Sequence, residues 1–329
     1  MISRWVLTIL AIFISQVVVS AAEPSVLTPV RTIELKTLLD VSKRVPTITA
    51  LAIDKTGERI AIGGDEGTVR LLDTTNEKII WEQRKYTERI LGAAISNDGK
   101  LLLTVDQKGN INKWDAANGK LINSQVSTIR GVQNVAIKPD GTEFAICGYD
   151  DTVICYSIAD GKQTFSLKAP SNGNRSISYS PDNKLLAVAG RSGVIRLWNC
   201  EPNSPNKTLA RDLPGDERRV NAIAFNTTGS QLASAGEGPS ILIWDTATGG
   251  KIKQLAERPG KTFSLLFCND SILASGESDN VIRVWNLRND TRVGDLLGHT
   301  GTVAVLVYNQ VSKQMVSGSF DTTVRFWTH

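Results

Sequence analysis

Short segments in which apolar and polar residues alternate follow one another along almost the whole chain. Residues 281–285 (Val-Ile-Arg-Val-Trp) are typical of one kind, and residues 185–190 (Leu-Leu-Ala-Val-Ala-Gly) of a second kind that is apolar and small. Turns containing Asn, Asp and Gly, such as residues 97–99 and 139–141, separate the segments. Alternation with period two predicts β-strands, and these turns are typical of hairpins. The pattern therefore predicts an all-β fold of short antiparallel strands.

One arrangement of these segments returns seven times along the chain. Each copy ends in a large residue followed by a polar residue, and the small apolar segment lies before that pair. The seven pairs are Leu72-Asp73, Trp114-Asp115, Tyr156-Ser157, Trp198-Asn199, Trp244-Asp245, Trp285-Asn286 and Trp327-Thr328. They recur about every 42 residues, which is the length of a four-stranded propeller blade. The sequence thus predicts a seven-bladed β-propeller over residues 30–329, with repeats ending near residues 73, 115, 157, 199, 245, 286 and 328.

The two ends of the repeat region complement each other. The sequence stops two residues after Trp327, so no fourth strand follows in the last repeat. A surplus alternating segment, residues 30–39, precedes the first repeat. We expect this N-terminal segment to complete the last blade and close the ring, because an open ring would leave sheet edges free to pair with other chains.

The pattern resembles the WD-repeat family, and the resemblance extends over roughly residues 30–329. The last repeat is the most similar, because it contains a Gly-His pair, a Ser-Gly-Ser-Phe-Asp turn and a final Trp. The resemblance implies that His299, Ser317, Asp321 and Trp327 form a hydrogen-bonded set inside this blade. The other repeats have no Gly-His pair, and a turn acid recurs only as Asp150, Asp279 and Glu66. We therefore expect the other six blades to lack the buried polar set.

The first 22 residues have the features of a secretion signal. Arg4 supplies a positive charge, residues 5–20 are almost entirely apolar, and Ala21 and Ala22 are small residues before the polar Glu23. This predicts a cleaved signal peptide at residues 1–22, followed by a short linker at residues 23–29. An uncleaved membrane anchor is the alternative, since sixteen apolar residues nearly span a bilayer. We expect a secreted or periplasmic, and bacterial, protein.

The sequence offers little for catalysis. Its two histidines are His299, which the resemblance assigns to structure, and His329 at the end of the sequence. Motifs for zinc, haem, phosphate or serine-esterase chemistry are missing, so we expect no catalytic residues, no metal site and no cofactor. Cys147 and Cys155 fall on neighbouring predicted strands. Free buried thiols are the favoured state, and a disulfide is the alternative, because diagonal pairs across strands are usually too far apart.

A cation occupies the position just before the first strand in six of the seven repeats. These residues are Arg44, Arg89, Arg130, Arg175, Arg219 and Lys261. We expect them near one rim of the central channel, where they could bind an acidic partner segment or an anionic ligand. Mutual neutralisation is the favoured interpretation, because turn acids such as Asp150 and Asp279 reach the same rim and solvated charges on loop rims are ordinary.

These observations favour a platform for protein or peptide binding. The net charge of +4 gives no electrostatic case for nucleic acid. Binding platforms are typical of the WD-repeat family, and the reactive groups needed for catalysis are missing. We therefore expect an exported, monomeric scaffold without catalysis of its own. Its expected partner is a protein or a peptide, and an acidic partner is one possibility. The alternatives are a propeller enzyme, or a protein that binds a small ligand or glycan at the channel mouth.

Overall fold

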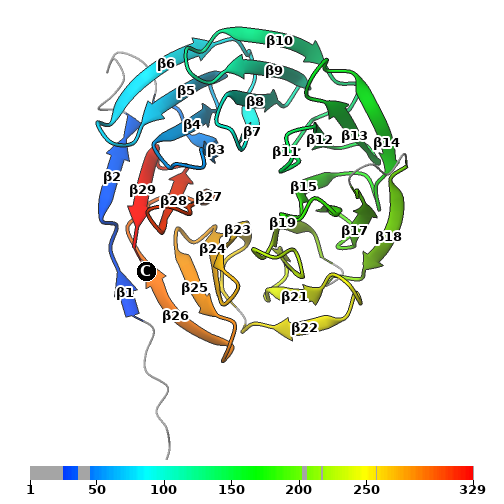
Figure 1. Ribbon diagram of the computed structural model, residues 1–329. Coiled ribbons are helices and arrows are strands. Elements are labelled where there is room, and N and C mark those ends of the chain that lie inside the picture. Colours follow the sequence, from blue (N-terminus) through cyan, green and yellow to red (C-terminus); the bar gives the residue numbers. More distant parts are fainter. Residues whose placement is uncertain (1–24, 36–44, 202–205, 216–217, 257, 329) are drawn as a thin grey trace, which may run out of the picture.

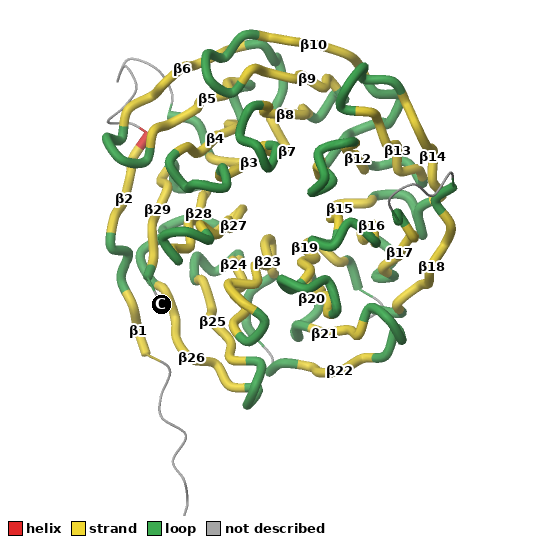
Figure 2. Tube along the Cα trace, viewed as in Figure 1, coloured by secondary structure: helices red, strands yellow, loops and turns green. Residues whose placement is uncertain are grey.

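The strands form a ring of seven sheets around a central channel (Figure 1). The computed structural model describes residues 25–35, 45–201, 206–215, 218–256 and 258–328. Within these residues, strands and the turns that join them make up nearly the whole structure (Figure 2). The predicted signal peptide lies outside the described residues. The predicted all-β seven-bladed propeller is confirmed.

Each of the first three blades contains four consecutive antiparallel strands, which run from the channel outwards. Blade 1 consists of β3 (Ile48–Ile53), β4 (Arg59–Gly64), β5 (Thr68–Asp73) and β6 (Lys78–Arg84). Blade 2 consists of β7 (Ile90–Ile95), β8 (Leu101–Asp106), β9 (Asn110–Asp115) and β10 (Leu121–Val126). Blade 3 consists of β11 (Asn134–Ile137), β12 (Glu143–Cys147), β13 (Thr152–Ser157) and β14 (Gln163–Lys168).

The remaining blades continue this order, and the last two include strands from the N-terminal region. Blade 4 consists of β15 (Asn174–Tyr179), β16 (Leu185–Gly190), β17 (Ile195–Asn199) and β18 (Thr208–Leu213). Blade 5 consists of β19 (Val220–Phe225), β20 (Gln231–Gly236), β21 (Leu242–Asp245) and β22 (Lys251–Gln254). Blade 6 consists of β23 (Thr262–Asn269), β24 (Ile272–Glu277), β25 (Ile282–Asn286), β26 (Thr291–Leu296) and β1 (Ser25–Leu27). Blade 7 consists of β27 (Val303–Asn309), β28 (Gln314–Ser319), β29 (Thr323–Trp327) and β2 (Arg31–Glu34).

The ring closes through strand β2, which is the outer strand of blade 7. It pairs antiparallel with β29, and the register places Arg31 opposite Phe326 and Ile33 opposite Val324. Ile33 is buried in a hydrophobic cluster with Val324 and Phe326. The predicted closure is therefore confirmed for the described part of the segment.

The expected linker at residues 23–29 contains a strand instead. Strand β1 pairs in parallel with β26, so blade 6 has a fifth strand at its outer edge (Figure 1). Three residues are too few to show an alternating pattern, which explains why this strand was not predicted. The outer edge of β26 supplies the unpaired backbone groups that β1 needs.

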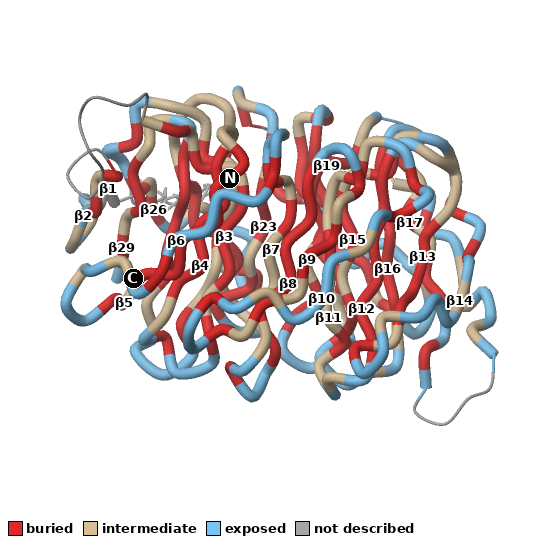
Figure 3. Tube along the Cα trace, turned by 90° about the horizontal axis from the view of Figure 1, so that it is seen from above, coloured by how far each residue is buried: buried red, intermediate tan, exposed pale blue. Residues whose placement is uncertain are grey.

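The hydrophobic core lies between neighbouring blades. Small residues in the second strand, such as Ala61 in blade 1, allow the next blade to approach closely, and its Trp114 is almost fully buried. Trp81, on the outer strand β6, packs against Trp114 with 6.1 Å between ring centroids and donates a hydrogen bond to the Ala116 carbonyl oxygen. The turned view in Figure 3 shows buried strands between exposed loops. Each blade is therefore stabilised mainly by its two neighbours.

The structure brings His299, Ser317, Asp321 and Trp327 together inside blade 7. The Trp327 indole N–H donates to Ser317 Oγ over 2.8 Å, and Ser317 Oγ lies 2.7 Å from His299 Nε2. His299 Nδ1 lies 2.8 Å from Asp321 Oδ2. A neutral imidazole protonated on Nδ1 satisfies every donor in this set.

No other blade contains the complete set, as expected, but three of them retain one part of it. The tryptophan indole donates to a hydroxyl ten residues earlier in three more blades: Trp114 to Thr104, Trp244 to Ser234 and Trp285 to Ser275. The corresponding positions of blades 1, 3 and 4 hold Ile62, Ile146 and Val188, which cannot accept a hydrogen bond.

Two blades place a different residue where blade 7 has His299. In blade 2 the hydroxyl of Tyr86 lies 2.7 Å from Thr104 Oγ1. In blade 6 the buried Arg258 lies 3.4 Å from Glu277, whose carboxylate accepts a hydrogen bond from Ser275. Tyrosine and an arginine–glutamate pair can thus satisfy the buried hydroxyl as histidine does.

Substitution of Ile33 tests the closure of the ring. Ile33→Asp places an unpaired charge in the core between β2 and β29, so we expect the free energy of unfolding to fall by about 3 kcal/mol or more. Thr32→Asp is the matched control, because Thr32 is on the same strand and is exposed; it should cost about 1 kcal/mol or less. Urea denaturation measures both. Equal, small losses for the two variants would contradict closure by β2.

The histidine of blade 7 makes stability depend on pH. Burial lowers the pKa of His299, although the hydrogen bond to Asp321 opposes this shift. Because the unfolded chain binds the proton more readily, the set should stabilise the fold at neutral pH and lose this contribution as the pH falls below about 6.5.

Comparison with His299→Gln isolates this effect. Glu277 acts in the opposite sense, since burial raises its pKa while Arg258 and Arg283 oppose the rise, and it is present in both proteins. Urea unfolding at several pH values should show the wild type losing more stability than His299→Gln between about pH 7.5 and pH 5.5. Parallel pH profiles for the two proteins would show that His299 does not titrate on unfolding.

Candidate functional site

Two loop residues from every blade meet at one rim of the channel. In six blades, the residue just before the first strand accepts a backbone hydrogen bond from the residue just after the second strand; in blade 3 the same bond joins Arg130 and Tyr149, which lie a few residues outside strands β11 and β12. We call these the rim pairs, and they are Thr47–Asp65, Arg89–Gln107, Arg130–Tyr149, Gly173–Arg191, Arg219–Glu237, Lys261–Ser278 and Thr302–Phe320. The sevenfold repetition of this bond shows which loop residues are equivalent.

In blades 4 and 5, glycine at the end of the second strand lets the two rim loops approach very closely. A Cβ on Gly236 would lie 2.0 Å from the Arg219 carbonyl oxygen, and a Cβ on Gly190 would lie 2.3 Å from the Gly173 carbonyl oxygen. Such contacts are too close for any larger residue without a backbone shift. The rim pair itself does not require glycine, because the second strands of blades 2, 6 and 7 end in Asp106, Glu277 and Ser319 and form the same bond.

Two of the predicted rim cations are neutralised. Arg130 Nε lies 2.8 Å from Asp150 Oδ1, and Lys261 Nζ lies 3.6 Å from Glu237 Oε1. Both cationic side chains are more than half exposed, so these ion pairs contribute little to stability. At these two positions the geometry agrees with mutual neutralisation.

The other predicted cations do not share one position. Arg89 and Arg219 occupy rim positions, and Arg44 lies outside the described residues. The placement of Arg175 just before the first strand is wrong, because Gly173 takes the rim position in blade 4. Strand β15 has already begun at Arg175, and a register shift in its pairing with β16 marks a β-bulge there. Arg175 therefore lies further into the channel than the rim.

The bulge recurs, and its residues line the channel mouth. Six blades shift register after the first residue pair of their inner hairpin, and the bulged residues are Thr49, Leu91, Arg175, Asn221, Phe263 and Ala304. They line a cavity of about 110 Å³, together with Arg89, Gln133, Asn134 and Phe320. Every blade therefore contributes to the mouth.

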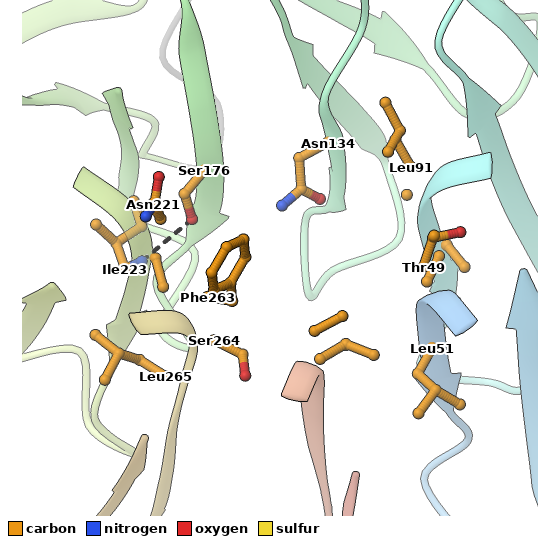
Figure 4. A pocket seen from close by; sticks show the side chains of 16 residues that line it. Thr49, Leu51, Leu91, Asn134, Ser176, Asn221, Ile223, Phe263, Ser264 and Leu265 are labelled. Carbon is orange, nitrogen blue, oxygen red and sulfur yellow. Dashed lines mark hydrogen bonds between the residues drawn. The ribbon is translucent and has the colours of Figure 1, made fainter. Parts of the chain in front are cut away.

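The channel below the mouth has a wall of small and apolar residues. A cavity of about 170 Å³ is lined there by side chains such as Leu51, Ser176 and Ile223. Figure 4 shows Ile223 and Thr49 at opposite sides of this space. The Ile223 backbone N–H donates to Ser176 Oγ, which joins the walls of two blades. This narrow space suits water or one side chain of a partner, and not a folded domain.

Aromatic residues that were not predicted from the sequence are exposed at the rim. Tyr149 and Phe320 are 52% and 38% exposed, and both belong to rim pairs. The Arg175 guanidinium lies 5.5 Å from the centroid of the Phe263 ring. Both Tyr149 and Phe320 are the rim-pair residues that follow the second strand, and this position could have been compared across the repeats of the sequence.

A second cavity opens beside the mouth, on the side of blades 3, 4 and 5. It has a volume of about 320 Å³, and its lining includes Tyr149, Arg175, Arg191 and Arg219. We call it the arginine pocket. Arg175 and Gln133 line both this pocket and the mouth, so the two spaces are neighbours. Arg191 was not predicted, although it is the cationic member of a rim pair.

Reactive groups do not gather at the mouth. Among the described residues, the structure contains no group of three or more His, Cys, Asp or Glu that could hold a metal ion. Cys147 and Cys155 are buried free thiols, and burial raises the pKa of Cys155 to about 12. Across the same residues, no helix has the length and apolarity to cross a membrane. What the mouth offers chemically is aromatic surface, amide groups and guanidinium groups, which bind rather than react.

Two family models match the chain. The model described as outer membrane protein assembly factor BamB matches residues 65–296, and the model of the WD domain, G-beta repeat, matches residues 290–328. The second match contains His299, Ser317, Asp321 and Trp327, the set that the sequence shares with WD repeats. The resemblance found in the sequence is thus supported for the last repeat, and the longer match is to another propeller family.

Relatives of known name match parts of the chain. Human pre-mRNA-processing factor 17 is 31% identical over 40% of this chain, which is 23% of the relative. Arabidopsis thaliana autophagy-related protein 16 is 29% identical over 36% of this chain and 24% of its own length. Drosophila melanogaster protein groucho is 27% identical over 41% of this chain and 19% of its own length. The matched region thus spans less than a quarter of each relative.

Proposed function

We propose that this chain, which belongs to the propeller family described as outer membrane protein assembly factor BamB, is an exported platform for protein–protein interaction. The observation that carries the proposal is the mouth of the channel. Seven blades line a cavity of about 110 Å³ there, whose lining includes the exposed Phe320, the half-buried Phe263 and two arginines, Arg89 and Arg175, that form no ion pair within the described part of the chain. Tyrosine, tryptophan and arginine dominate binding energy at protein interfaces, and fold alone does not determine function.

The composition of the mouth favours binding over catalysis. A hydrolytic or redox site needs a nucleophile with a base, a metal or paired carboxylates. The mouth is lined instead by groups such as Thr49, Leu91, Asn221 and Ala304. His299, the one described histidine, is occupied in the core of blade 7. The WD-type propellers to which the last repeat is similar are typically scaffolds, and this supports a platform without catalysis of its own.

Two exposed aromatics at the rim are the expected anchors of the partner, Phe320 at the mouth and Tyr149 at the cavity beside it. We expect Tyr149→Ala combined with Phe320→Ala to weaken binding by about tenfold or more, since interface aromatics commonly contribute this much. The proteins captured from the exported fraction of the producing cells by the wild type should be lost with this double variant. Val311→Ala is the control, because Val311 is 69% exposed at the other end of β27 and β28. A partner that both variants capture equally would contradict binding at the mouth.

Export is the second part of the proposal, and it rests on the N-terminal sequence. A cationic start, an apolar run and small residues before Glu23 are what a signal peptidase recognises. The protein purified from its producing cells should therefore begin at Glu23, as measured by intact mass. Ile12→Arg interrupts the apolar run and should leave the full chain inside the cytoplasm. A purified wild-type protein that retains residues 1–22 would contradict cleavage.

A further inference from the structure

Three guanidinium groups converge on the arginine pocket. Arg175 comes from the bulge of β15, Arg191 from the turn after β16 and Arg219 from the loop before β19. Arg191 is exposed, whereas Arg175 and Arg219 are half-buried. Two neighbouring blades therefore direct three positive charges to one cavity of about 320 Å³.

The three arginines of this pocket form no ion pair with a carboxylate of a described residue. Elsewhere near the rim, cations form ion pairs, as Lys108 does with Glu88 over 2.7 Å. In the described part of the chain, no carboxylate forms an ion pair with Arg175, Arg191 or Arg219. The reason lies in the rim pair of blade 4. The position of Arg191 is held by Asp65 in blade 1 and by Glu237 in blade 5, so blade 4 reverses the sign of the charge.

The electrostatic environment shows that Arg219 and Arg89 act on Arg175. Burial lowers the pKa of Arg175, and the charges of Arg219 and Arg89 lower it further, whereas Tyr149 and Glu237 oppose the shift. Guanidinium groups stay charged under these conditions, because their ordinary pKa lies far above neutral pH. The pocket is therefore positively charged, and a bound oxyanion would neutralise this charge through charge-assisted hydrogen bonds.

A buried hydrogen-bond acceptor in the same pocket indicates that the ligand carries a donor beside its anionic group. Asn174 lines the pocket and is fully buried, and its Nδ2 donates to the carbonyl oxygens of Asp150 and Ser171. Its Oδ1 is buried without a hydrogen-bond partner among the described residues. A buried acceptor needs a donor. A peptide carries backbone N–H donors beside its carboxylates, whereas pyrophosphate is chiefly an acceptor.

The neighbouring channel mouth adds an apolar subsite. Gln133 and Arg175 line both spaces, and the mouth beyond them contains Leu91, Phe263 and Phe320. An extended chain can therefore place a charged side chain in the pocket and a neighbouring apolar side chain in the mouth.

We propose that the arginine pocket binds a carboxylate side chain of an acidic peptide segment, and that an adjacent apolar residue of the same segment enters the channel mouth. This proposal rests on the proposed function as an interaction platform, and it assigns the chemistry of the partner. The arginines form bidentate hydrogen bonds to the carboxylate. The segment binds as a short extended strand whose backbone supplies the donor for Asn174.

A blocked, fluorescein-labelled peptide of sequence Glu-Leu-Glu-Leu-Glu is a direct probe, with Gln-Leu-Gln-Leu-Gln as its neutral partner. Fluorescence anisotropy at low salt should show saturable binding of the acidic peptide to the full-length protein and about tenfold weaker binding of the neutral one. Arg191→Gln and Arg219→Gln should each reduce binding of the acidic peptide to the level of the neutral peptide. Arg130→Gln is the matched control, because Arg130 is a rim arginine already paired with Asp150, and it should bind like the wild type.

Three results would overturn the proposal. The first is equal binding of the two peptides. The second is an equal loss of affinity for the acidic peptide in Arg130→Gln and Arg191→Gln. The third is binding of inorganic pyrophosphate with no binding of the acidic peptide. The last would identify the pocket as a site for a small oxyanion. Far-ultraviolet circular dichroism shows whether each variant is folded, and the exposed Arg191 is the position whose substitution disturbs the core least. A natural partner that binds the mouth and is unaffected by Arg191→Gln would refute the pocket and leave the platform function standing.

Discussion

The pairing of β2 with β29 is the interaction on which the rest of the structure depends. Each blade of a propeller packs against its two neighbours, so the first and last blades are complete only when the ring is closed. Residues at opposite ends of the sequence, such as Ile33 and Val324, lie opposite each other in this pairing. The channel mouth is a consequence of closure, because its lining takes residues from all seven blades. The functional surface therefore exists only in the closed ring.

Within the closed ring, blades vary as long as buried polar groups are satisfied. Blade 7 uses His299 for this purpose, blade 2 uses Tyr86, and blade 6 uses Arg258 with Glu277. Other blades dispense with the hydroxyl and fill its position with an aliphatic side chain such as Val188. Both solutions avoid an unsatisfied buried hydroxyl, which would cost more than either. This freedom explains why the repeats diverge while their length stays nearly constant.

The sequence predicted the features that repeat and missed those that depend on local register. Blade number and closure follow from periodicity, which survives substitution of individual residues. Arg175 was misplaced because a β-bulge shifts it inwards, and a bulge leaves no mark in the pattern of apolar residues. The substitutes Tyr86 and Arg258 could have been found, since each precedes its rim residue by the same interval as His299. The clustering of Arg191 with Arg175 and Arg219 needed three-dimensional coordinates, because the three lie on different loops and strands.

Closure of the ring can be measured directly by amide hydrogen exchange. If β2 is an integral strand of blade 7, its amides should exchange as slowly as those of β27 and β28, through unfolding of the whole ring. Fast exchange of β2 at the rate of a free chain terminus, with β27 and β28 still protected, would contradict closure. It would also remove the structural basis of a mouth built from seven blades.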